Sequence, residues 1–407
     1  MKIFYKIYYF LYGIYRIFFP IIYFSNYVDT NFEKFKINKI RYSKNIEIFY
    51  EHFRSTIPYD EIKKVFPKNI FLKILNKKKI NYKKKYIKNL LNIKLNFEQW
   101  LFLYKFSIRL GYFFLAKSFK NMAFKEILNN FNNDKIKSSV YFESSKFKES
   151  LKLLPTSSKN NNEFRYLLKT IIRKKNFLNL LDKNSKLFEL VNKKKILIIA
   201  PIKKKINYEK YIKKCDTVFL FGYISKSQYN FLDLNGKKVA TYLSGNNALK
   251  IINLKYNINT NLDLLLFKEK SQKIKYKKIM NRKIISDYCK YKFQNYLTGN
   301  LSGLQILLLN LLINNPKEIQ VVGADLFITH GLKKQIKNHN FLFKNMHKEE
   351  GLLKSFTDHD LNFIFILTKY IFNLKILKAD KYLKNIIRLS INKYNSILEN
   401  QFKGVDY

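Results

Sequence analysis

Short apolar runs separated by polar turns dominate the second half of the chain. Between these runs lie segments with apolar residues three and four positions apart, such as 302–315 and 361–372, a spacing typical of helices. Strands that alternate with helices predict a mostly parallel, Rossmann-like α/β sheet covered on both faces. The runs that have the length and β-branched content of buried strands are 193–201, 215–223, 237–246, 262–268, 319–325 and 372–380.

The first half of the chain has helical periodicity and no strand pattern. The clearest part is 96–131, where Gly111 and Ala116 would let two helices approach closely and Trp100 would pack between them. Pro, Ser and Asn cluster at 154–164, which predicts a linker. We therefore expect an all-helical region before the sheet and divide the chain into four parts: 1–24, 25–190, 191–385 and a C-terminal tail helix, 386–407.

Residues 1–24 are apolar and aromatic, but Lys6, Arg16 and Pro20 interrupt them. The segment lacks the roughly 18 uncharged residues of a membrane-spanning helix. No small-residue cleavage site follows it, which argues against a signal peptide. Two interpretations remain, a helix that lies in the interface of an anionic membrane and a first helix packed on the core.

The composition limits the possible partners. The chain has 407 residues, 47% of them hydrophobic, and a formal net charge of +49. Lys, Asn, Ile, Phe and Tyr are enriched together, which indicates compositional drift of a whole genome rather than one basic site. Such a surface attracts anions without specificity, and the absence of zinc-finger, helix-turn-helix and RNP-like patterns argues against a specific nucleic-acid partner. The two cysteines lack the spacing of a zinc site or a disulfide framework.

Ligands of parallel sheets bind at the carboxyl ends of the strands. Asp325, just after the fifth predicted strand, could accept hydrogen bonds from sugar hydroxyls, bind a metal or cap the next turn. Gly323 would let the backbone turn sharply or approach a ligand. Ser302 and Gly303 open a helix whose free N–H groups suit a phosphate, although an ordinary capped core helix would look the same. The strand-end candidates are Ala200, Pro201, Gly222, Tyr223, Ser244, Asn246, Gly323 and Asp325.

Four of the five histidines lie between His330 and His359. Their spacing does not favour a metal site. His359 stands between Asp358 and Asp360 just before a predicted helix, so a neighbouring carboxylate could orient it as a general base. His330, His339 and His347 are also compatible with a solvated loop.

The order of these motifs is similar to that of a known family. Ser302-Gly303, an apolar helix, Lys317-Glu318-Ile319, a strand and Gly323-Ala324-Asp325 follow one another. Over about 193–380 the chain resembles bacterial sialyltransferases of glycosyltransferase family 42 and the related motility-associated-factor and hydroxymethylpterin pyrophosphokinase-like proteins. The resemblance implies a nucleotide-binding α/β fold and sugar transfer from a CMP-linked donor without a metal or other cofactor.

In that family a lid histidine deprotonates the acceptor hydroxyl. The matching residue here is His359, with His347 as the second candidate. The lid tyrosines that hold the donor phosphate in the family are missing between Phe327 and Lys369. Lys333, Lys334 and Lys337 could supply the positive charge instead.

We therefore expect a cytoplasmic glycosyltransferase, peripheral at the inner face of the cytoplasmic membrane, that acts on a cell-surface or capsular glycan. One alternative is a non-catalytic glycan- or nucleotide-binding accessory protein, because the first loop has only Ala200-Pro201 where the family has Gly-Asn-Gly-Pro-Ser. Another is a pyrophosphokinase-like enzyme, which would need acidic residues beside Asp325.

Overall fold

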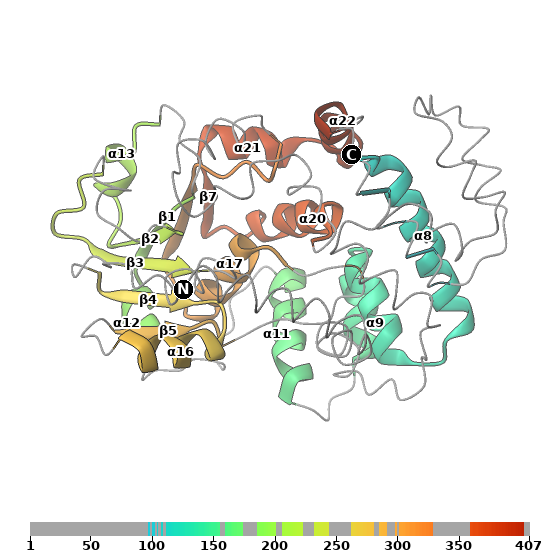
Figure 1. Ribbon diagram of the computed structural model, residues 1–407, viewed down its shortest axis with the longest axis horizontal. Helices are drawn as coiled ribbons and strands as arrows, with labels where there is room; N and C mark the ends of the chain where they lie inside the picture. The colour runs from blue at the N-terminus through green and yellow to red at the C-terminus, as the bar shows by residue number, and fades with distance from the viewer. Residues whose placement is uncertain are drawn as a thin grey trace, which may run out of the picture.

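The computed structural model of the chain is an α/β structure with one parallel sheet (Figure 1). Seven strands lie in the order β5-β4-β3-β2-β1-β6-β7, and every pair is parallel. The residues that the structure describes are 97, 100, 101, 104, 107, 108, 111–154, 159–173, 185–200, 206–222, 232–243, 262–280, 285–290, 298, 301–328 and 359–402.

The strands are β1 (Lys195–Ile199), β2 (Thr217–Phe221), β3 (Lys238–Leu243), β4 (Leu264–Phe267), β5 (Ser286–Tyr288), β6 (Glu318–Val322) and β7 (Leu377–Ala379). Six of them were predicted from their apolar runs. The prediction missed β5, because its three residues include the polar Ser286 and Asp287 and so lack an apolar run. The prediction of a mostly parallel sheet is confirmed, and all seven strands are in fact parallel.

The helices before the sheet are α8 (Phe113–Asn130), α9 (Asp134–Glu143), α10 (Phe147–Leu153), α11 (Lys159–Arg173) and α12 (Lys186–Val191). Those within and after it are α13 (Glu209–Ile212), α16 (Lys270–Met280), α17 (Gly303–Ile313), α20 (Leu361–Phe372), α21 (Lys381–Arg388) and α22 (Ile391–Phe402). The segment expected to be a linker is helical from Lys159 onward, because Phe164, Leu167 and Leu168 bury an apolar stripe that outweighs its polar start. The boundary expected at 385 falls inside α21.

The two faces of the sheet bury alternate residues of each strand. On β1, Ile196 and Ile198 join a large apolar cluster with α17, α20 and the helices before the sheet, whereas Leu197 and Ile199 join a smaller cluster with α13 and α16. Figure 1 shows α17 and α20 between the sheet and the group of α8, α9 and α11. Burial on both faces explains why the strands read as continuous apolar runs.

The expected helical hairpin lies at one side of this large cluster. Gly111 has a φ of 78°, and the Tyr112 N–H donates to the Ser107 carbonyl at 2.8 Å, as in a Schellman end to the first helix. The ring centroid of Trp100 lies 5.7 Å from that of Phe119 on α8. Trp100 therefore packs where the sequence placed it.

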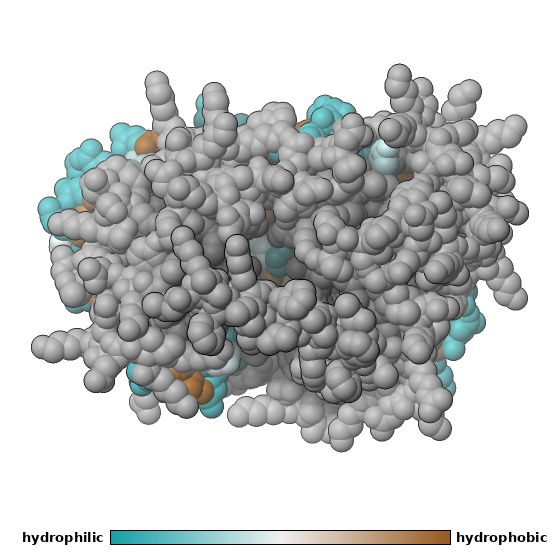
Figure 2. Space-filling view, in the orientation of Figure 1, coloured by the Kyte–Doolittle hydropathy of each residue, from teal (hydrophilic) through white to brown (hydrophobic). Residues whose placement is uncertain are grey.

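Among the described residues, the exposed large hydrophobic side chains are Ile274, Ile285 and Tyr370. Figure 2 shows a small hydrophobic area over α16 with hydrophilic residues beside it, and Ile274 of this helix is 45% exposed. No helix in the described part of the chain is long and apolar enough to cross a membrane. Residues 1–24, for which we expect a membrane-interface helix, lie outside the described residues.

Both cysteines are free and buried, which predicts that they react slowly with thiol reagents. Burial raises the pKa of Cys215 to about 11 and raises that of Cys289 further. Because the thiolate is the reactive form, we expect a thiol reagent at pH 8 to react with neither cysteine in the native protein and with both in urea. The measurement is a time course with a chromogenic disulfide reagent. Rapid reaction of either thiol in the folded protein would contradict the burial.

Candidate functional site

The strand order reverses between β1 and β6, and the candidate site lies at this point of the sheet. From β1 the chain proceeds to β2 on one side, while β6 and β7 lie on the other. Ile199 pairs with Val322, and the Ala200 N–H donates to the Val322 carbonyl at 2.9 Å. The loops after β1 and β6 therefore start side by side, at the position where open α/β sheets bind ligands.

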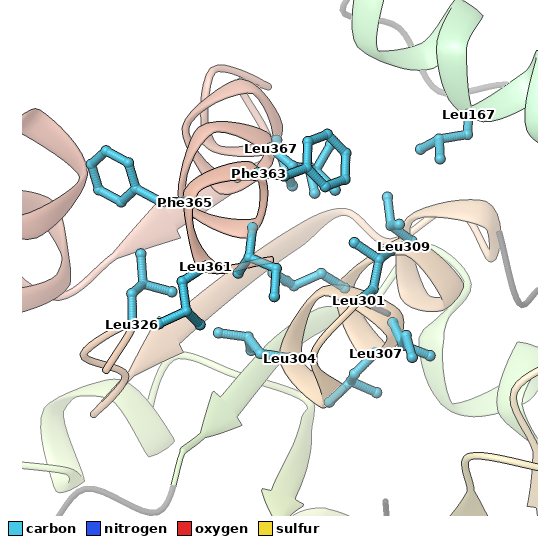
Figure 3. Packing of buried hydrophobic residues seen from close by; sticks show 14 of the residues in the cluster. Leu167, Leu301, Leu304, Leu307, Leu309, Leu326, Leu361, Phe363, Phe365 and Leu367 are labelled. Carbon is cyan, nitrogen blue, oxygen red and sulfur yellow. The ribbon is translucent and has the colours of Figure 1, made fainter. Parts of the chain in front are cut away.

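In a parallel sheet, the helix that connects two strands begins at the carboxyl end of the first strand. The helices α17 and α20 therefore begin at the same edge of the sheet as the loops after β1 and β6. Figure 3 shows Leu304 near the start of α17, Leu326 after β6 and Leu361 at the start of α20 pointing toward one another. These three side chains are buried in the large apolar cluster. We call the candidate residues that the structure describes along this edge the carboxyl-end site: Ala200, Ser302, Gly303, Gly323, Asp325 and His359.

Gly323 ends β6 with a φ of 77°, a conformation that favours glycine. The sharp backbone turn expected there is confirmed. Its N–H, however, donates to the Asp380 carboxylate at 2.8 Å, and Asp380 also caps α21 by accepting from the Leu383 N–H at 2.7 Å. The Gly323 amide is thus already used within the protein and does not face a ligand.

Asp325 lies in a turn with unusual backbone geometry. Its carboxylate accepts from the Phe327 N–H at 3.0 Å, and its carbonyl accepts from the Ile328 N–H at 3.1 Å. Leu326 and Phe327 have φ of 49° and 66°, values that bulky residues rarely adopt. The carboxylate therefore caps its own turn, one of the roles expected for it, and is only 4% exposed.

Tyr394 of α22 supports this turn, a role that no pattern in the sequence indicated. Its hydroxyl donates to the Leu326 carbonyl at 2.8 Å, and its ring stacks on Phe365 of α20 at 4.2 Å between centroids. Burial raises the pKa of Tyr394 well above 10.0, and the charges of Asp325 and Asp360 raise it further. Tyr394 thus links the Asp325 turn to the start of α20.

Ser302 occupies the N-cap position of α17, as the sequence indicated, but its side chain accepts no hydrogen bond from the first turn. Its hydroxyl contacts the Gln305 side chain, which donates to Thr368 on α20 at 2.7 Å. By contrast, Asp360 and Asp380 cap their helices with their side chains. The Ser302 side chain thus does not cap the amides of the first turn of α17.

His359 is half-buried and directly precedes the N-cap residue of α20. Asp360, which the sequence offered as a partner for its ring, has other contacts. One oxygen of Asp360 accepts from the Phe363 N–H at 3.1 Å, and the other binds Lys120 and Thr298. The suggestion that Asp360 orients the His359 ring is therefore not supported, because its carboxylate is committed elsewhere.

The second carboxylate in this region is Glu143 of α9. Lys120 of α8 forms an ion pair with Asp360, and its Nζ lies 3.6 Å from Glu143 Oε2. The Thr298 hydroxyl contacts both carboxylates, at 2.7 Å from Asp360 Oδ2. We call Lys120, Glu143, Thr298 and Asp360 the Lys120 network. All four residues are 6% exposed or less.

The ionisation of the groups in the Lys120 network depends on how their charges are paired. Burial alone would raise the pKa of Asp360, but the charge and hydrogen bond of Lys120, with hydrogen bonds from Thr298 and Phe363, lower it below its ordinary value. Burial and the charges of Asp360 and Glu143 raise the pKa of the neighbouring Tyr104. Asp360 is therefore ionised and Tyr104 is neutral at pH 7.

Tyr208 is a further residue that the sequence did not single out. It precedes α13, on the chain between β1 and β2. Burial and the charge of Asp380 raise its pKa to about 12, so its neutral hydroxyl lies near the carboxylate that holds Gly323. Tyr208 thus adds a hydrogen-bonding group beside the reversal of the sheet.

Several candidates lie outside the described residues: Pro201, Tyr223, Ser244, Asn246, Lys333, Lys334 and His347, together with His330 and His339. Gly222 ends β2 with a φ of 77°, and its N–H donates to the Tyr242 carbonyl. Within the described ranges, no group of three His, Cys, Asp or Glu side chains could hold a metal ion.

Comparisons of the chain with protein-family models, curated proteins and solved structures give no match.

The Lys120 network predicts the effect of removing its cation. Lys120→Met would leave two carboxylates buried without their counter-ion, which typically costs about 3–5 kcal/mol. The measurement is the free energy of unfolding in urea. Lys117→Met is the matched control, since Lys117 lies on the same helix and its contact with Asn392 is exposed; it should change stability by less than about 0.5 kcal/mol. Equal effects of the two variants would contradict the network.

The lowered pKa of Asp360 predicts acid sensitivity. The folded state binds the proton less tightly than the unfolded state, so this stabilisation is complete above about pH 5 and disappears as pH falls below 3.8 through the folded pKa. We expect Asp360→Asn to remove this part of the pH dependence when urea unfolding is compared at pH 6 and pH 3. Asp134→Asn, at an exposed position, should keep the wild-type dependence. A wild-type slope in Asp360→Asn would show that other acids are responsible.

Proposed function

We propose that the protein is a glycosyltransferase that transfers a sugar from a CMP-linked donor to a cell-surface or capsular glycan. The observation that carries the proposal is the strained turn of Asp325 at the reversal of strand order, beside the end of β1. Residues in rarely adopted backbone conformations cluster at ligand sites, and the carboxyl edge at such a reversal is where nucleotides bind.

Three groups have the chemistry that the reaction needs. The first-turn amides of α17, which Ser302 does not cap, would bind the donor phosphate with help from the helix dipole. The Asp325 carboxylate, just after β6 at the carboxyl edge of the sheet, would accept a hydrogen bond from a sugar or ribose hydroxyl. His359, at the start of α20, would take the proton of the acceptor hydroxyl, with His347 as the alternative base.

The proposed location is the inner face of the cytoplasmic membrane. The net charge of +49 favours contact with anionic lipid, and residues 1–24 have the composition of an interface helix. There the enzyme would meet both a cytoplasmic sugar nucleotide and a membrane-linked glycan acceptor.

A second candidate function is non-catalytic binding of a nucleotide or glycan in polysaccharide assembly. It is favoured by the burial of Asp325, whose carboxylate caps its own turn, and by the Gly323 amide, which Asp380 already binds. Incubation with CMP-, UDP- and GDP-sugars separates the two functions. Binding by calorimetry without release of nucleotide would favour the accessory protein, and the absence of both would refute the two proposals together.

The roles of His359 and Asp325 give opposite kinetic predictions. We expect His359→Ala to lower kcat by about 100- to 10,000-fold and to leave the Kd for the donor unchanged, because a general base acts in the chemical step. Asp325→Asn keeps an oxygen that can cap the turn but loses the charge, so it should weaken donor binding while the protein stays folded.

The matched control is Asp233→Asn, because Asp233 caps an exposed turn in the same way, accepting from the Asn235 N–H at 3.1 Å. It should leave kcat and donor affinity unchanged. Normal turnover by His359→Ala would exclude His359 as the base and move the role to His347.

A further inference from the structure

We propose that Lys120 and Glu143, from the helices before the sheet, are positioning residues for His359. The proposal rests on the proposed function only for the role of His359 in catalysis. Lys120 and Glu143 lie on α8 and α9, far from His359 in the sequence, yet both contact the residues that fix the start of α20.

The first step is how Asp360 is held. Its two carboxylate oxygens have different partners: Oδ1 accepts from the Phe363 N–H, and Oδ2 binds Lys120 and Thr298. The carboxylate therefore has one orientation, which fixes the backbone of the N-cap residue. His359 precedes it by one peptide bond, at a Cα separation of about 3.8 Å, so the same contacts restrict the main chain of His359.

The second step is how Lys120 and Glu143 are held. The Lys120 ammonium lies 5.0 Å from the ring centroid of Phe124 and 5.8 Å from that of Phe363, in addition to its carboxylate partners. Glu143 accepts from the Thr298 N–H at 3.2 Å and contacts the Thr298 hydroxyl. Residues from α8, α9, the segment before α17 and the start of α20 thus meet at one buried point.

The third step is why an ionic network stands where apolar side chains would fit. Apolar replacements of buried ion pairs are often as stable as the pair, so stability alone does not explain it. Hydrogen-bonded charges require defined angles, which apolar contacts do not. The network therefore provides a fixed geometry at the residue that precedes α20, and this is what a general base needs.

The network also has a charge imbalance, with one ammonium group against two carboxylate side chains. Among the described residues, the ionisable groups influenced by Asp360 include Tyr104 and Tyr394, and burial raises the pKa of both, so both are neutral at pH 7. Glu143→Gln would therefore change the charge of the network while it keeps the size of the side chain.

The experiment compares Lys120→Met, Lys120→Arg and Glu143→Gln in the full chain, with Lys117→Met as the control. The first readout is the NMR spectrum of histidine-labelled protein. The chain has five histidines, so five side-chain signals are expected. The signal of His359 is identified by its loss in His359→Gln. We expect it to move or broaden in Lys120→Met and in Glu143→Gln, to return toward its wild-type position in Lys120→Arg, and to stay in place in Lys117→Met.

The second readout is kinetic. In Lys120→Met and Glu143→Gln we expect kcat to fall by about 10-fold or more, with KM for the donor unchanged within about twofold, because only the chemical step depends on the base. If Lys120→Met does not fold, Glu143→Gln, which keeps the shape of the side chain, decides the question.

Two outcomes would overturn the proposal. A His359 signal that is unchanged in folded Glu143→Gln, or a loss of stability without any change at His359, would show that the network only supports the fold. If the wild-type protein proves to have no transferase activity, the proposed function fails, but the NMR comparison still tests whether Lys120 and Glu143 position His359.

Discussion

The buried ammonium group of Lys120 sets a constraint that the surrounding structure must meet. An ion removed from water costs several kcal/mol unless charged and hydrogen-bonding partners surround it. Asp360 and Glu143 supply those partners, and they belong to different parts of the sequence. Satisfying one cation therefore brings α8 and α9 against the start of α20, at the carboxyl edge of the sheet. The contact joins the helices before the sheet to the part of the fold where a ligand would bind.

Elsewhere in the described part of the chain, acidic side chains also connect elements that are distant in the sequence. Asp380 caps α21 and also holds the Gly323 amide at the end of β6. Glu399 of α22 accepts from the Phe114 N–H in the first turn of α8. In a chain with 78 basic and 29 acidic residues, these buried carboxylates join helix starts to distant segments. The acids described here define how these elements meet.

The sheet was predictable from the sequence, because strands buried on both faces produce apolar runs that need no information about their neighbours. The start of α20 at Leu361 was also visible, since Asp360 is a typical N-cap residue. The partner of Asp360 was not. Asp360 stands beside His359 in the sequence, which suggested an Asp–His pair, but its carboxylate binds Lys120, 240 positions away. The short strand β5 was missed for the opposite reason, because hydrogen bonds to β4 define it rather than apolar content.

Only part of the geometry of the Asp325 turn could be predicted from the sequence. Gly323 and Asp325 marked a turn after β6, and the positive φ of Gly323 agrees with that prediction. The strain lies in the next two residues, Leu326 and Phe327, which carry no sequence signal for it. Such a conformation persists only when its surroundings enforce it, and here the Tyr394 hydroxyl and the Asp325 carboxylate do so. Since Tyr394 also packs on Phe365 of α20, a shift of α20 would strain or release this turn. The base proposed at His359 and the ligand group proposed at Asp325 are therefore mechanically linked through α22.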